Sequence, residues 1–223
     1  MRFFGKHATP RNRDFLFFIA GVLSLGLFGY LIRRTMRKSS TDKAFSGEFL
    51  LPEKAGQVPR YRLGDLEFRV DRQRKTVCAF HAETGERVWE SHGEDRFIVP
   101  GAAFPIDLSD DGTLWAANVG RKRLEQLDPT TGVFIASWEP KQPFGGCCNP
   151  VRFAALAGGR FVTMEKGVRR VCIYWPSGDL ERVVTDTLSD SEYQYYLLRD
   201  RDAVGGDTVH LYDTGCQQHW VVR

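Results

Sequence analysis

The chain has 223 residues, of which 42% are hydrophobic and 26% are charged, proportions that are normal for a globular protein. Its net charge of +3 is uneven, because residues 1–38 contain eight of the 31 basic residues and a single acidic residue, Asp14. From Ser39 onward 23 basic residues face 27 acidic ones, and this balance of about −4 argues against a nucleic-acid partner.

The first predicted element is a membrane-spanning helix at residues 15–32, preceded by a short tail at residues 1–14. The segment FLFFIAGVLSLGLFGYLI has 18 residues and no charge. As a helix it spans roughly 27 Å, close to the thickness of about 30 Å of a bilayer core. Arg33 and Arg34 follow the apolar run directly, where a cleaved signal peptide would have a small-x-small site. We expect an uncleaved single-pass anchor; a buried helix of a soluble domain is the alternative.

Residues 61–223 contain a repeat of about 47 residues, and residues 33–60 connect it to the predicted helix. Three glycines that follow a turn-forming residue and precede a strand-like run are spaced by 47 residues: Gly112, Gly159 and Gly206. A second turn, of the Thr-Gly or Ser-Gly type, recurs with Gly85, Gly132 and Gly178. Regular turn chemistry between short β-rich runs is typical of an all-β repeat architecture.

The second unit shows the predicted content of one repeat. Its strands are expected at residues 104–109, 113–118, 123–128 and 133–138, each short and rich in β-branched or aromatic residues. Four antiparallel strands in about 47 residues form one blade of a β-propeller. The predicted fold is therefore an all-β, β-propeller-like domain of about four blades at residues 61–223, which is either a small or a partial propeller.

The last predicted unit lacks a fourth strand, because only CQQHWVVR follows the run TVHLYDTG. Residues 44–53, AFSGEFLLPE, can supply the missing outer strand, so residues 33–60 contain a linker and a candidate closing strand. Closure of this kind removes exposed strand edges. The alternative is an open arc that a partner chain completes. If residues 44–60 close the domain, deletion of residues 44–56 destabilises it.

Two stretches of the repeat domain resemble known propeller families. Residues 113–139 (TLWAANVGRKRLEQLDPTTGVFIASWE) and residues 149–184 are similar to NHL repeats, whereas residues 76–90 (TVCAFHAETGERVWE) look more like the blade motif of quinoprotein-type propellers. The resemblance covers roughly residues 61–223. It implies the architecture and leaves the function open, since propellers host many functions.

Polar residues at equivalent repeat positions are the first candidate site. The positions that recur every 47 residues are Asp71, Asn118 and Glu165, together with Arg123 and Arg170. In the repeat they lie on the same rim, and the resemblance to NHL-type blades implies that an acidic group there braces the adjacent bend. We expect such bracing, with the two arginines as partners through charge-assisted hydrogen bonds. A calcium site like that of propeller lactonases is the alternative, although its pattern does not match residue by residue, and no metal is assigned.

Two adjacent cysteines in PFGGCCNP are the second candidate site. Five cysteines without a CxxC motif describe neither a disulfide framework nor a zinc site. Cys147, Cys148 and Asn149 lie where one blade leads into the next, and with Glu165 they are expected at the mouth of the central channel. The two cysteines can form a vicinal disulfide, or they can be small buried residues beside a tight turn.

The motifs favour a binding protein over an enzyme. The five histidines are scattered, and neither a nucleophile elbow nor a phosphate loop occurs. The leading hypothesis is a membrane-tethered β-propeller that acts as a protein-binding scaffold or accessory subunit of a membrane-associated complex. The alternative is a small-molecule hydrolase or redox protein that uses the channel mouth near Cys147 and Cys148. A ligand sensor is a third reading, and no cofactor is identified.

The repeat domain is expected outside the cytoplasm, attached to the cell membrane by one span. The short N-terminal tail and the family resemblance favour this orientation, whereas RRTMRK at residues 33–38 favours the opposite one. The predicted partners are the membrane and another protein subunit.

Overall fold

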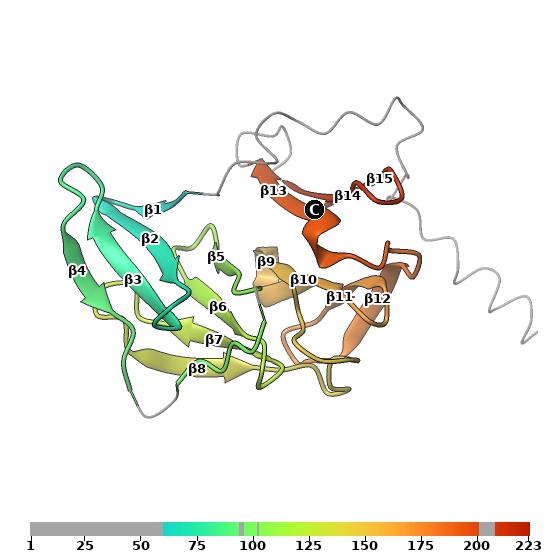
Figure 1. Cartoon of the computed structure of the whole chain (residues 1–223), viewed down its shortest axis with the longest axis horizontal. Helices are drawn as coiled ribbons and strands as arrows, with labels where there is room; N and C mark the ends of the chain where they lie inside the picture. The colour runs from blue at the N-terminus through green and yellow to red at the C-terminus, as the bar shows by residue number, and fades with distance from the viewer. Residues whose placement is uncertain (1–59, 94–95, 102, 201–207) are drawn as a thin grey trace, which may run out of the picture. The chain divides into compact units, whose positions relative to one another are not determined.

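A computed structural model describes residues 60–93, 96–101, 103–200 and 208–223 of the chain. Over these ranges the chain forms β-strands and short 3₁₀ segments, and the strands group into four antiparallel sheets (Figure 1). Within each sheet, strands that follow one another in sequence pair with one another, so hairpins connect them. The prediction of an all-β, propeller-like fold with about four blades is confirmed.

The four sheets are named here in chain order. The first sheet contains β1 (Tyr61–Leu63), β2 (Leu66–Asp71), β3 (Thr76–His81) and β4 (Arg87–Glu90). The second sheet contains β5 (Ile106–Leu108), β6 (Leu114–Asn118), β7 (Arg123–Leu127) and β8 (Phe134–Trp138). The third sheet contains β9 (Arg152–Leu156), β10 (Arg160–Glu165), β11 (Arg170–Tyr174) and β12 (Leu180–Thr185), with the 3₁₀ segment η2 (Ala157–Gly159) after β9. The fourth sheet contains β13 (Tyr195–Asp200), β14 (Thr208–Asp213) and β15 (Gln218–Val222), and the 3₁₀ segment η3 (Glu192–Gln194) precedes it.

The repeat of glycines marks the same turn in successive sheets. Gly112 precedes β6 and Gly159 precedes β10, and both have positive φ angles, +81° and +72°. A side chain is strained in this conformation, so glycine suits the tight turn between the first and second strands of a blade. The four strands predicted for the second unit correspond to β5, β6, β7 and β8 within two residues at each end. Gly206 lies outside the described residues.

The first strand of each sheet contacts the first strand of the next. β1 contacts β5, β5 contacts β9, and β9 contacts β13, so the four innermost strands line a shared axis, as in the blades of a propeller. The outer parts of neighbouring sheets are linked by tryptophans. Trp89 Nε1 donates to the Pro129 carbonyl oxygen at 3.0 Å, and Trp138 Nε1 donates to the Pro176 carbonyl oxygen at 3.1 Å.

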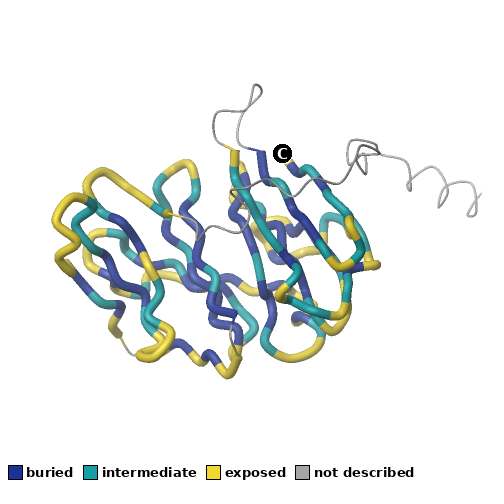
Figure 2. The backbone as a smooth tube through the Cα atoms, turned by 45° about the horizontal axis from the view of Figure 1, so that its top comes forward, coloured by how far each residue is buried: buried dark blue, intermediate teal, exposed yellow. Residues whose placement is uncertain are grey.

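The apolar core lies between the sheets. One cluster of buried side chains joins the first three sheets, and a second cluster joins the third and fourth sheets. Figure 2 shows the buried residues in dark blue along the strands and the exposed ones in yellow mainly at the turns. In the first cluster the ring of Trp138 lies 4.5 Å from that of Phe161, across the boundary between the second and third sheets. Burial of aromatic and branched side chains at each boundary removes apolar area from water and holds neighbouring blades together.

The fourth sheet has three strands within the described part of the chain, as expected from the short last unit. No described strand pairs with the outer edge of β15. Residues 44–59 of the candidate closing segment lie outside the described residues, as do the tail at residues 1–14 and the apolar segment at residues 15–32. In the portion of the chain that the structure describes, no helix has the length and apolar character needed to cross a bilayer. Closure and the anchor therefore stay predictions.

Candidate functional site

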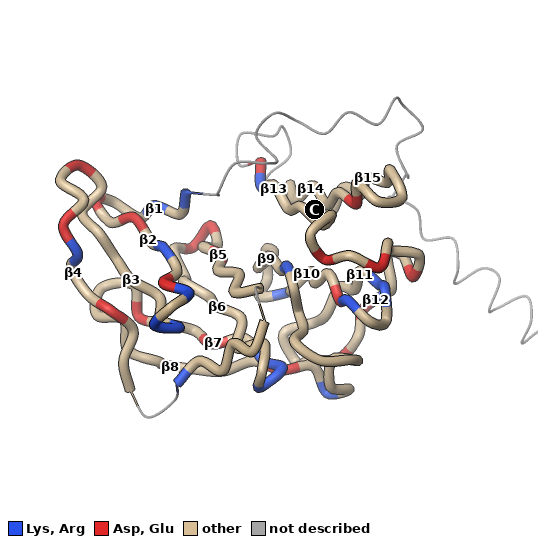
Figure 3. Tube along the Cα trace, in the orientation of Figure 1, with Lys and Arg blue, Asp and Glu red and all other residues tan. Residues whose placement is uncertain are grey.

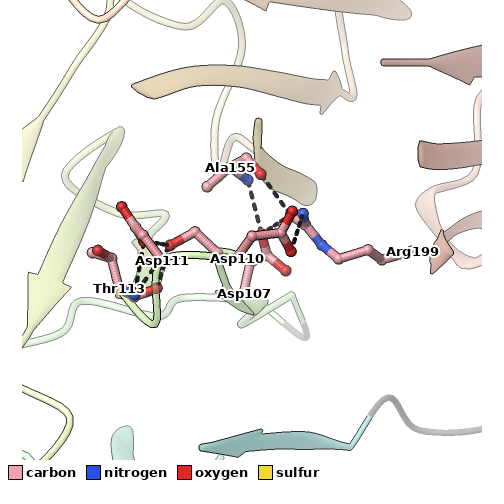
Figure 4. A network of polar contacts seen from close by, with 7 residues as sticks. Asp107, Asp110, Asp111, Thr113, Ala155 and Arg199 are labelled. Carbon is pink, nitrogen blue, oxygen red and sulfur yellow. Dashed lines mark hydrogen bonds and ion pairs between the residues drawn. The ribbon is translucent and has the colours of Figure 1, made fainter. Parts of the chain in front are cut away.

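Three blades are joined near the axis by a buried ion pair (Figure 4). Arg199 Nη2 on β13 donates to Asp107 Oδ2 on β5 at 2.5 Å and to the Ala155 carbonyl oxygen on β9 at 2.6 Å. The Ala155 amide in turn donates to Asp107 Oδ2 at 2.8 Å. The side chain of Arg199 is 9% exposed and that of Asp107 is 2% exposed. This arrangement fixes the second, third and fourth sheets relative to one another.

The hairpin after β5 completes this polar region. Ser109 Oγ donates to Asp111 Oδ1 at 2.5 Å, and the Thr113 amide donates to the same carboxylate oxygen at 3.0 Å. These hydrogen bonds, that of Ser109 first, lower the pKa of Asp111. The segment DLSDDG therefore forms a tight β-turn whose acidic groups stabilise the turn itself or face Arg199.

Glu165, at the end of β10, is fully buried and holds three neighbours. Its Oε1 accepts hydrogen bonds from Thr163 Oγ1 at 3.0 Å and from the Tyr174 hydroxyl at 2.8 Å. Its Oε2 accepts from Arg170 Nε at 2.9 Å. Burial, followed by the Glu165 carboxylate, raises the pKa of Tyr174, and burial raises the pKa of nearby Cys172 to about 12. The site is thus a closed polar network inside the third sheet.

Asn118 holds the corresponding position on β6 with different partners. Its Oδ1 accepts from the Ile98 amide at 2.9 Å, and its Nδ2 donates to Glu125 Oε1 at 2.8 Å. Arg123 Nε donates to the same Glu125 oxygen at 2.7 Å. Arg123 therefore pairs with Glu125 on its own strand, and Asn118 connects this pair to the segment that enters the second sheet.

Asp71 holds the corresponding position on β2, and its hydrogen bonds to other described residues stabilise its own turn. Its Oδ1 accepts from the amides of Gln73 and Arg74, both at 2.9 Å. The three repeat-equivalent residues therefore lie at the ends of β2, β6 and β10, where each binds groups of its own sheet or of the segment entering it. The structure does not bring them together, and their contacts are those of bracing groups.

Asn149 joins the loop after β8 to the turn after β10. Its Nδ2 donates to the carbonyl oxygens of Gly145 at 2.5 Å and Lys166 at 2.8 Å, and its Oδ1 accepts from the Lys166 amide at 3.0 Å. The residue is fully buried. Asn149 therefore satisfies backbone groups of two loops, and its side chain is occupied by structural contacts.

Cys147 and Cys148 lie beside the same turn as two free thiols, the first exposed and the second half-buried. Burial, together with the hydrogen bond and charge of Cys147, raises the pKa of Cys148. The nearby Lys166 Nζ forms an ion pair with Glu192 Oε1 at 2.7 Å, which raises the pKa of Lys166. The structure thus brings the cysteine pair next to Lys166 and Glu192, while the carboxylate of Glu165 lies inside the third sheet.

Metal-ligating residues are dispersed over the described ranges. In residues 60–93, 96–101, 103–200 and 208–223, no three His, Cys, Asp or Glu side chains are arranged to hold a metal ion.

Comparisons with known proteins show similarity to solved propeller structures alone. No family model matches the chain, and no curated protein matches it. The chain is similar to a structure titled "Streptogramin B lyase structure", with 15% identity, a TM-score of 0.47 and coverage of 70% of this chain and 47% of that chain. It is also similar to virginiamycin B lyase from Staphylococcus aureus (13% identity, TM-score 0.49, coverage 71% and 48%) and to BamB from Moraxella catarrhalis (15%, 0.39, 74% and 48%). The chain spans about half the length of these proteins, and similarity at this level carries no argument about function.

Several residues that organise the fold were missed from the sequence. The ion pair between Asp107 and Arg199 occurs once and therefore leaves no periodic signal. The tryptophan links do leave one, because Pro129 and Pro176 are 47 residues apart and follow the third strand of successive sheets. That spacing could have identified Trp89 and Trp138 as their donors.

Proposed function

We propose that this chain is a membrane-tethered β-propeller-like scaffold or accessory subunit that binds another protein. The observation that carries the proposal is the use of the buried carboxylates. Asp107, Glu125 and Glu165 are all buried, and each binds side chains or backbone groups that hold sheets or loops together. Polar groups used in this way make a rigid frame, which suits a surface for recognition.

The tether rests on the apolar segment at residues 15–32, which is uncharged and has basic residues on both sides. We place the repeat domain outside the cytoplasm, in line with the short N-terminal tail. A reporter fused after Arg223, active in only one compartment, tests this orientation. Reporter activity on the cytoplasmic side would show that the repeat domain has the opposite orientation.

A cross-linking experiment on the full chain in native membranes tests the scaffold function. A photo-reactive amino acid is placed singly at Gln73 in the turn after β2, at Ile135 on β8 or at Tyr193 in η3. Ile135 is 56% exposed and Tyr193 is 71% exposed. We expect a discrete adduct of defined mass from at least one position, in the membrane fraction. A chain that washes off membranes with alkaline carbonate, or that gives no adduct from any position, would contradict the proposal.

The redox alternative keeps one observation in its favour, the two neighbouring thiols of Cys147 and Cys148. The raised pKa of Cys148 works against its use as a thiolate nucleophile, because the thiolate is the reactive form. Thiol labelling followed by mass spectrometry, with and without oxidant, separates the readings. A vicinal disulfide that forms and is reduced reversibly supports a redox role, and two labelled thiols under oxidising conditions exclude it.

A further inference from the structure

One face of the first sheet is rich in arginine and points away from the second sheet. Strand pairing places Arg62 opposite Glu67, Glu67 opposite Phe80 and Phe80 opposite Arg87, so these residues share a face. The opposite face contains Phe68, Val77, Ala79 and Trp89, which are buried in the core shared with the second sheet. The face that points away from the second sheet is called the arginine face here and is defined by Arg62, Glu67, Arg69, Phe80, Arg87 and Glu90. Figure 3 shows basic and acidic residues intermingled along β1 to β4.

Positive charge exceeds negative charge on the arginine face. Glu67 is shared by Arg62 Nη2 at 3.0 Å and Arg69 Nε at 2.8 Å. Glu90 is likewise shared by Arg74 Nη1 at 3.3 Å and Arg87 Nη1 at 3.1 Å. Arginine stays protonated under all physiological conditions. On the arginine face and the turn after β2, five arginines therefore outnumber the three carboxylates of Glu67, Asp71 and Glu90.

Glu67 keeps its charge although it is 5% exposed. The hydrogen bond from Arg69 lowers the pKa of Glu67, and this effect outweighs the opposite effect of burial. The two arginines on this buried carboxylate are therefore held in place, and their outer N–H groups point to directions that Glu67 does not use. Each guanidinium has five donors, of which Arg69 commits only one to the carboxylate.

A hollow of about 720 Å³ lies over this face and extends to the turn after β2. Arg69, Arg72 and Arg87 line it, with Phe80 and Cys78 among the residues beneath. The guanidinium carbon of Arg69 lies 5.0 Å from the ring centroid of Phe80, an arrangement that orients the cation over an aromatic surface. Arg72 also lines the hollow, and it has no ion-pair partner among the described residues.

We propose that this hollow binds an acidic segment of a partner protein, whose carboxylates pair with Arg69, Arg72 and Arg87. The inference rests on the proposed scaffold function and names its partner class and binding site. Guanidinium groups bind carboxylates through paired N–H donors, and the Phe80 ring offers apolar contact to the segment between them. The carboxylates of Asp71 and Glu90 at the same site repel a uniformly anionic lipid or nucleic-acid surface, whereas a peptide can match mixed charges.

Fluorescence anisotropy on the full chain in neutral detergent micelles tests the proposal. The probe is a dye-labelled peptide in which three glutamates are separated by leucine and lysine residues, and the same peptide with glutamine in place of each glutamate is its control. We expect binding of the acidic peptide alone, weakening as salt is added. Arg72→Glu and Arg87→Glu should each weaken it about fivefold or more, since they replace attraction with repulsion. Lys141→Glu, an exposed site outside the hollow, is the matched control and should leave binding unchanged.

Three results overturn the proposal. The first is equal binding of the acidic peptide to wild type and to both arginine variants when their melting curves coincide. The second is binding to phosphatidylcholine vesicles containing phosphatidylglycerol, lost in both variants, with no binding of the peptide; the hollow would then bind lipid headgroups. The third is self-association that Arg72→Glu abolishes, which would make a second copy the occupant.

The outcomes also separate this inference from the scaffold function. Adducts from Ile135 or Tyr193 without peptide binding would refute the hollow and leave the scaffold standing. Peptide binding at the hollow without any adduct in membranes would refute the scaffold in its proposed setting. Because Arg72 makes no described ion pair, Arg72→Glu tests recognition without removing a contact that stabilises the sheet.

Discussion

Arg199 and Asp107 are 92 residues apart in sequence and form an ion pair, with Nη2 and Oδ2 separated by 2.5 Å. The pair connects the innermost strand of the fourth sheet to that of the second sheet, past the backbone of Ala155 in the third. Three consecutive blades therefore depend on one buried contact, in addition to the apolar clusters between them.

Removing one partner of this pair should be strongly destabilising. Asp107→Ala leaves the guanidinium of Arg199, which is 9% exposed, without its main acceptor. We expect a loss of about 3 kcal/mol in the free energy of unfolding, measured by urea denaturation, because the buried guanidinium loses its close carboxylate and keeps the longer 3.9 Å contact with exposed Asp110. Lys141→Ala breaks the exposed ion pair with Asp179 and should change the free energy of unfolding by about 0.5 kcal/mol or less. Equal effects at the two sites would contradict the role assigned to Asp107.

The network around Glu165 predicts a smaller, graded effect at Tyr174. Tyr174→Phe removes the hydroxyl that donates to Glu165 at 2.8 Å inside the third sheet. We expect a loss of about 1–2 kcal/mol, since a buried carboxylate oxygen loses one of its donors. Tyr193→Phe is the control, because Tyr193 is 71% exposed and should show almost no change. A Tyr174→Phe variant as stable as wild type would show that the hydroxyl contributes nothing.

Two glycines of the same recurring turn should respond differently to alanine. Gly132 has φ +79°, and a Cβ there would lie 2.5 Å from Trp89 Cε3, whereas Gly85 has φ +71° with nothing within 4 Å of such a Cβ. Gly85→Ala should cost about 1 kcal/mol from backbone strain alone. Gly132→Ala should cost at least about 1 kcal/mol more, because the ring that links two blades must move. Thermal melting of both variants measures the difference, and equal melting temperatures would refute the steric argument.

The paired histidines of the fourth sheet predict a loss of stability in mild acid. His210 Nδ1 and His219 Nε2 are 3.0 Å apart, and burial lowers the pKa of both below the ordinary value of 6.5. The folded state therefore binds fewer protons than the unfolded state. The stability that the two neutral histidines contribute is present in full above about pH 6.5 and is lost as the pH falls through their lowered pKa values.

Melting curves between about pH 7 and pH 5 measure this effect on stability. The double variant His210→Gln, His219→Gln should show a shallower decline than wild type, because the two groups that must take up protons are gone. An identical decline would mean that other groups cause the acid sensitivity.

The sequence predicted the blades well and the contacts between blades poorly. β6 and β10 were predictable because a turn glycine, an apolar run and a polar strand end recur at a spacing of 47 residues. These signals are local, and each blade repeats them. Asp107 and Arg199 escaped because their pairing depends on how β5 and β13 approach the axis, and no periodic pattern records a contact made once.

The candidate sites show the same division. Arg170 was predicted to brace Glu165 and lies 2.9 Å from it, since both belong to one hairpin. Arg123 instead contacts Glu125, because the equivalent of Glu165 in the second sheet is Asn118, an amide that itself donates to Glu125. The arginine face was overlooked because its residues come from four strands, with no motif in sequence.

Because Trp89 donates to Pro129 and Trp138 donates to Pro176, each of these two tryptophans is an intrinsic fluorescence probe at a boundary between neighbouring sheets. Indole emission shifts to longer wavelength as water reaches the ring. Trp89 therefore reports the separation of the first and second sheets, and Trp138 that of the second and third. Two variants, one with Trp89 and the other with Trp138 as the single tryptophan left of the chain's five, would show whether the two boundaries open together or in succession. Intrinsic emission can thus show, without any added dye, which boundary between sheets separates first during unfolding.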